Sequence, residues 1–103
     1  MEEIIIIIDL EEFSKDKPNE RPEKGKKYQI RVDRDKYVVH SDSLKGKEIL
    51  ELAEKTPFDR FQLNQKIRTG LVKKIGYEEL VDFTEPGIER FMTIPLDQQE
   101  GSR

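Results

Sequence analysis

The chain has 103 residues, of which 34% are hydrophobic, and this is enough for one domain with a modest core. Charged residues make up 40% of the sequence but nearly cancel to a net charge of -3, so no strong field favours nucleic acid or an anionic membrane. The absence of cysteine excludes disulfides, thiolate metal sites and a cysteine nucleophile, and it favours a cytoplasmic location.

Residues 1–26 are expected to be an N-terminal extension in two parts. The first part is a run of β-branched residues, Ile4, Ile5, Ile6, Ile7 and Ile8, and it is flanked by acids. Such a run favours an extended strand with two apolar faces. It is too short for a secretory signal or a membrane span. Residues 14–26 are charged and contain two prolines, one glycine and almost no apolar side chain. This composition predicts a linker, and residues 10–26 as a whole would act as a tether.

The patterned domain begins at residue 27 with a strand, a turn, a second strand and a helix. Tyr28, Ile30 and Val32 alternate with polar residues, as expected for a strand with one buried face. Residues 37–39 follow a charged turn as the second strand. Residues 45–55 then carry apolar side chains at three- and four-residue spacing, which predicts an amphipathic helix. This order within about thirty residues is typical of a β-grasp domain.

The rest of the chain predicts three more strands and a polar tail. Residues 61–67 and 71–75 are the expected third and fourth strands, residues 77–83 a short helical turn, and residues 88–95 the last strand. The expected fold is therefore α+β, a ubiquitin-like β-grasp with a mixed four- to five-stranded sheet around one helix over residues 27–96, and a flexible tail at 97–103. The residues expected to be buried are Ile30, Val32, Ile49, Leu52, Ala53, Leu63, Leu80 and Phe91.

Three stretches carry a family resemblance, namely KYQIRVDRDKYVV at 27–39, KGKEILELA at 45–53 and YEELVDFTEPGIERFMTIP at 77–95. The last is the most specific, because its ELVD turn, Pro-Gly break and ERF strand are not general features of β-grasp domains. On these residues the chain resembles the bacterial multiubiquitin family of ubiquitin-like proteins. The resemblance implies a protein modifier whose partners are an activating enzyme, a conjugating enzyme and a processing peptidase.

The C-terminal tail contains the glycine on which conjugation would depend. An activating enzyme must bring a narrow terminus close to ATP, and Gly101 has no Cβ to obstruct that approach. In this interpretation Ser102 and Arg103 are a propeptide that a peptidase removes. The alternative is that a single glycine in a polar tail only adds flexibility. The Gly-Gly ending of ubiquitin is absent, and this chain has one domain where many members of the family have several in tandem.

The isoleucine run is interpreted as an interaction strand. An aliphatic strand with acidic flanks resembles the motif that binds ubiquitin-like modifiers by adding to the edge of their sheet. The tether could reach the chain's own domain or another copy, and we expect the crossing, which gives head-to-tail self-association. The alternative is an ordinary extra strand on its own domain. The expected acceptor edge lies beside the second strand and the helix, at Val38, His40, Lys45, Lys47 and Lys55.

No pattern in the sequence indicates catalysis, a metal site or a cofactor. His40 is the only histidine, and its neighbours Ser41 and Asp42 are too close in sequence for the usual assembly of a catalytic triad. The acids of residues 78–85 have no accompanying histidine and are expected to form a solvated face. The favoured function is a non-enzymatic modifier. The alternative is a β-grasp scaffold or self-assembling adaptor that is not conjugated.

Overall fold

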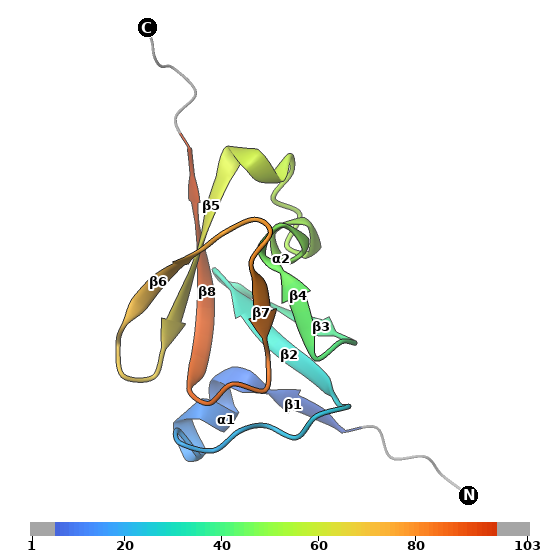
Figure 1. Cartoon of the computed structure of the whole chain (residues 1–103), viewed down its shortest axis with the longest axis vertical. Helices are drawn as coiled ribbons and strands as arrows, with labels where there is room; N and C mark the ends of the chain where they lie inside the picture. Colours follow the sequence, from blue (N-terminus) through green and yellow to red (C-terminus); the bar gives the residue numbers. More distant parts are fainter. Residues whose placement is uncertain (1–5, 97–103) are drawn as a thin grey trace, which may run out of the picture.

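The computed structural model describes residues 6–96, which form an α+β fold with a curved mixed sheet beside a short helix (Figure 1). The expected β-grasp fold is confirmed. The elements in chain order are β1 (Ile7–Asp9), α1 (Leu10–Asp16), β2 (Lys27–Val32), β3 (Asp35–Val39), β4 (Ser43–Lys45), α2 (Gly46–Leu52), a 3-10 turn (Phe58–Arg60), β5 (Phe61–Ile67), β6 (Val72–Ile75), β7 (Leu80–Asp82) and β8 (Ile88–Pro95).

The main sheet is built from two antiparallel units that meet along one parallel pair. Its strand order is β1-β2-β8-β5-β6, with β3 paired to β2 (Figure 1). β2 and β3 form a hairpin, while β5 lies antiparallel to both β6 and β8. The two units join where β2 and β8 run parallel, with Val32 opposite Phe91. β4 and β7 form a separate antiparallel pair.

Asp33 ties the two units together from the turn after β2. Its backbone has a φ of 57°, a left-handed conformation that aspartate tolerates better than most residues. Its N–H donates to the carbonyl of Phe91 at 2.9 Å. Its carboxylate accepts from the backbone N–H of Thr93 at 2.9 Å and from the Thr93 hydroxyl at 2.6 Å. The charged turn therefore continues the pairing of β2 with β8 through a side chain.

The core lies between the main sheet and α2. Tyr28, Ile30 and Val32 of β2 are buried while their neighbours are not, which confirms the period-two pattern. Phe83 and Phe91 are fully buried and meet edge to face, with ring centroids 6.4 Å apart. The other buried hydrophobic residues are Leu10, Val39, Ile49, Leu50, Ala53, Leu63, Ile75, Val81 and Ile88.

Two of the residues expected in the core lie elsewhere. Leu52 is only partly buried, because α2 directs Ile49 and Leu50 toward the sheet. Leu80 is 62% exposed, since residues 77–83 do not form the expected helical turn. Residues 80–82 are strand β7, paired to β4, and alternation along this strand places Val81 inward and Leu80 outward.

Residues 10–26 are not the tether that composition predicts. Residues 10–16 are helix α1, which begins after Asp9, whose carboxylate accepts from the N–H of Glu12 at 3.3 Å. Leu10 enters the core, which offsets the cost of ordering the helix. The following residues also contact the domain: Pro22 is buried, and the N–H of Gly25 donates to Asp42 at 2.9 Å. Among residues 6–96, no helix has the length and hydrophobicity of a membrane span.

Candidate functional site

Strand β1 lies against the first strand of the β-grasp domain, in a position that β8 leaves open. β3 pairs along the whole of one edge of β2, so β1 and β8 share the other edge. β8 reaches β2 only at Val32, and β1 runs parallel to the beginning of β2, with Ile7 opposite Lys27 and Ile8 opposite Tyr28. α1 then contacts both β2 and β8 (Figure 1). The N-terminal segment thus completes the sheet of its own domain.

Ion pairs hold the N-terminal segment in this position. Glu11 Oε1 lies 2.9 Å from Arg31 Nε and 3.4 Å from Lys36 Nζ, and Asp9 Oδ2 lies 2.6 Å from Lys36 Nζ. The Glu11 side chain is 16% exposed. Burial favours its neutral form, but the hydrogen bonds and charges of Arg31 and Lys36 outweigh burial, and the pKa of Glu11 is lowered. Arg68 adds hydrogen bonds from Nη2 to the Glu11 carbonyl at 3.3 Å and to Ser14 Oγ at 3.2 Å.

Within a single chain, the edge that accepts β1 therefore differs from the predicted one. Val38 and His40 are exposed and do not pair with β1. Lys45 and Lys47 pair with Glu78 at 3.2 and 2.9 Å, and Lys55 pairs with Asp33 at 3.8 Å. The open edge of β2, with Arg31 and Lys36 beside it, meets the acidic flank instead. Within this chain the strand pairs in cis, and head-to-tail self-association stays a prediction. Ile4 and Ile5 lie outside the described residues.

We expect acid to weaken the docking of the N-terminal segment. Because the pKa of Glu11 is lower in the folded protein, Glu11 contributes stability above its ordinary pKa of 4.5 and loses it as the pH falls through the folded value. Urea denaturation from pH 7 to pH 3 measures this. Glu11→Gln should cost about 1–2 kcal/mol at pH 7, and its curve should converge with that of the wild type in acid. Exposed Glu12→Gln is the matched control. A constant difference between wild type and Glu11→Gln at every pH would contradict the assignment.

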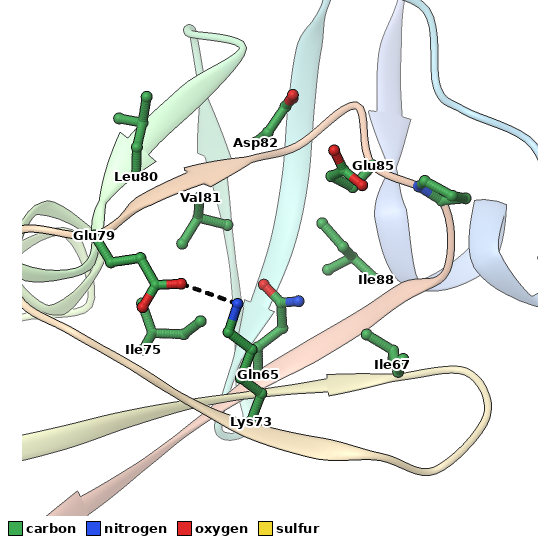
Figure 2. Close-up of a pocket in the computed structure, with 11 residues that line it drawn as sticks. Gln65, Ile67, Lys73, Ile75, Glu79, Leu80, Val81, Asp82, Glu85 and Ile88 are labelled. Carbon is green, nitrogen blue, oxygen red and sulfur yellow. Dashed lines mark ion pairs between the residues drawn. The ribbon is translucent and has the colours of Figure 1, made fainter.

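A pocket of about 360 Å³ lies between the β5–β6 hairpin and β7 (Figure 2). Its apolar lining comes from β5, β6, β7 and β8, and Figure 2 shows Val81 pointing into the space above the hairpin. Lys73 Nζ and Glu79 Oε2 form an ion pair of 3.0 Å on one side (Figure 2). The pKa of Glu79 is lowered, chiefly because Gly76 N–H donates to its carboxylate and also because of Lys73. The aliphatic residues of the lining are Ile67, Ile75, Leu80, Val81 and Ile88.

A second pocket of about 200 Å³ also reaches Ile75, and Lys74, Tyr77 and Leu96 contribute to its lining. Both pockets are missing from the expectations drawn from sequence. The lining of the first pocket comes from several strands between residues 65 and 88 and that of the second from residues between 62 and 96, and no spacing in the sequence signals that they converge. Only the order of the strands brings them together.

The residues considered for catalysis and metal binding do not form a site. His40 is exposed at the end of β3. Ser41 Oγ donates to the carbonyl of Ser43 at 2.8 Å, and Asp42 accepts from the hydroxyl of Tyr28 at 2.8 Å. Burial, together with Asp42, raises the pKa of Tyr28. Within residues 6–96 no three acids or histidines are close enough to hold a metal ion.

The last strand ends at the surface of the domain. β8 ends at Pro95, which is exposed, and the N–H of Leu96 donates to the carbonyl of Arg60 at 2.9 Å. The predicted conjugation residue Gly101 and the predicted propeptide, Ser102 and Arg103, lie outside the described residues.

The strand order and the helix packed on the sheet define a ubiquitin-like β-grasp domain. The family model for multiubiquitin matches residues 28–95, which is more than half of the chain, and the protein belongs to this family. Comparison with curated proteins and with solved structures gave no match. β1 and α1 precede the matched residues, so the segment that fills the open edge of β2 is an addition to the part described by the family model.

Proposed function

We propose that the protein is a ubiquitin-like modifier in a bacterial conjugation pathway, activated through its C-terminal tail after a peptidase cleaves behind Gly101. The observation that carries this proposal is the multiubiquitin match over the whole patterned domain. The protein would be a cytoplasmic substrate of an activating enzyme, a conjugating enzyme and the peptidase, and would not itself be an enzyme.

The exit of the chain from the sheet supports this proposal. β8 ends at exposed Pro95, so the following residues start from the surface. From Leu96 to Gly101 an extended chain can span up to about 17 Å, which is sufficient to enter a narrow active site while the domain stays outside. Glycine at the end of this span leaves room for the approach of ATP to the carboxylate.

We expect Gly101→Leu to block activation and leave the fold intact. A side chain at the terminus would obstruct adenylation, whereas the buried core of the described residues lies between Leu10 and Phe91. The protein would be isolated after co-expression with its neighbouring pathway enzymes, and its intact mass measured. The wild type should lose Ser102 and Arg103 and form adducts, and Gly101→Leu should not form adducts. Gln98→Leu is the matched control and should behave as the wild type. Wild-type chains that all end at Arg103 without adducts would contradict the proposal.

A second candidate function is a scaffold or self-assembling adaptor that is not conjugated. Two observations favour this function. β1 pairs with β2 on one edge and leaves its other edge without a partner among residues 6–96, and the side chain of Ile7 on β1 is 44% exposed. In that case mass spectrometry finds only unprocessed chains. Light scattering would then give a mass above that of the monomer, and Ile7→Glu would lower it.

A further inference from the structure

We propose that the free edge of β6 is a docking site for an extended acidic and aliphatic segment of a partner protein, which adds to the sheet as a further strand. The site lies at the opposite end of the sheet from β1, and its strand and pocket residues fall between residues 65 and 88. It therefore goes beyond the proposed function and holds whether or not the chain is conjugated.

The backbone of β6 is open to such a strand. In the part of the chain that the structure describes, β6 pairs with β5 alone and ends the main sheet. At the hairpin the N–H of Ile67 donates to the carbonyl of Leu71 at 3.0 Å. In an antiparallel ladder, residues whose N–H and C=O groups bond to the partner strand alternate with residues whose groups point away from it. Leu71 bonds to β5, so the backbone groups of Lys73 also point to β5. The N–H and C=O groups of Val72 and Lys74 point outward. Unpaired groups of this kind are a template for another strand.

The surroundings of this edge are apolar. Leu71 is 64% exposed and Val72 is 51% exposed, although both are large hydrophobic residues. Exposed Leu80 lines the adjoining pocket between the hairpin and β7. By strand alternation Leu71 faces the same side as Lys73 and Val72 the opposite side, so an added strand would cover exposed apolar surface on both faces of the sheet.

The pocket accounts for the aliphatic part of the partner. Successive side chains of a strand point to opposite faces of the sheet. Every second side chain of a strand added to β6 would therefore lie on the face of Gln65 and Lys73, which line the pocket (Figure 2). The space of about 360 Å³ exceeds the ~150 Å³ of a cavity that holds benzene. An isoleucine or leucine side chain fits there against Ile75 and Val81.

The lysines account for the acidic part. Lys73 is paired with Glu79, but Lys74 has no ion-pair partner within residues 6–96 and is exposed on the other face of the strand. A carboxylate of the added strand opposite Lys74 gains a partner, whereas a lysine there is repelled. The same repulsion disfavours edge-to-edge pairing of two copies of β6, because each edge carries Lys73 and Lys74. The structure thus favours a partner segment in which acidic and aliphatic residues alternate.

The test titrates the isotope-labelled full chain with an octapeptide of alternating glutamate and isoleucine and follows the backbone amides by NMR. We expect shift changes at residues 71–75 and in the pocket lining at Val81 and Ile88. Lys74→Glu should weaken binding about tenfold or more. Val72→Pro should do the same, because it removes an outward N–H while the pairing with β5 persists. Lys15→Glu makes the same charge change on α1 and should have no effect.

Several results would overturn the proposal. One is shift changes centred on β3 in place of β6. Another is equal binding by a peptide of alternating lysine and isoleucine, and a third is binding that neither Lys74→Glu nor Val72→Pro weakens. Shift changes at residues 71–75 that appear with rising protein concentration and vanish when residues 1–5 are deleted would assign the edge to a second copy. That outcome would replace the partner protein as the occupant.

Discussion

Replacing Ile49 with alanine should lower the free energy of unfolding by about 2–4 kcal/mol, measured by urea denaturation. Ile49 is fully buried on the face of α2 that packs on the sheet, so the shorter side chain leaves a cavity. A loss of this size is a large part of the total stability of a small domain, which is typically about 5–15 kcal/mol.

Leu80→Ala is the matched control for this measurement. It removes a similar apolar side chain, but Leu80 is mostly exposed on β7, and its loss should cost less than about 0.5 kcal/mol. Equal losses at Ile49 and Leu80 would mean that β7 presents its other face to the core, contrary to the burial of Val81 and the exposure of Leu80.

Gly46→Ala should destabilise the protein by about 2–3 kcal/mol, although alanine favours helices more than glycine does. A Cβ at Gly46 would overlap the backbone carbonyl oxygen of Gly76 and would lie 3.1 Å from the Ile75 side chain. The start of α2 cannot move away easily, because Gly46 N–H donates to the Glu79 carbonyl at 2.9 Å and Lys47 N–H to the Tyr77 carbonyl at 3.0 Å.

Gly76→Ala tests whether close approach is the cause. At Gly76 the nearest atom to an added Cβ is the Glu79 Cβ at 3.7 Å, an ordinary contact, and the change should cost less than about 1 kcal/mol. Thermal unfolding of both variants gives the comparison. A neutral or stabilising Gly46→Ala would show that the turn after β6 does not press on α2.

The amino-acid pattern was sufficient to predict the elements whose burial follows a simple period. Tyr28, Ile30 and Val32 alternate because one face of β2 meets the core, and Ile49 and Ala53 are four residues apart because α2 meets it with one stripe. These local patterns, with the motif at residues 77–95, were also sufficient for the family. The sequence also predicts Gly101 as the conjugation residue, and the measurement of intact mass tests this prediction.

Pairing between distant strands determines which side of a short apolar stretch is buried. Leu80 and Val81 are adjacent aliphatic residues, and no period can be read from a strand of three residues. Their orientation depends on β4, which lies more than thirty residues earlier and pairs Leu44 with Val81. The helical turn expected at residues 77–83 was wrong for this reason, since pairing with a distant strand outweighs local preference.

The position of the N-terminal strand also depends on the folded sheet. The isoleucines and their acidic flank predict a strand that needs an edge with bases beside it, but several edges of a β-grasp sheet have lysines. The choice of β2 follows from the separation of β2 and β8, which leaves room for β1 and α1, and from Arg31 and Lys36, which pair with Glu11 and Asp9. Local sequence determines whether a segment forms a strand or a helix. The free sheet edge and the basic side chains that accept it are brought together only after distant strands have paired.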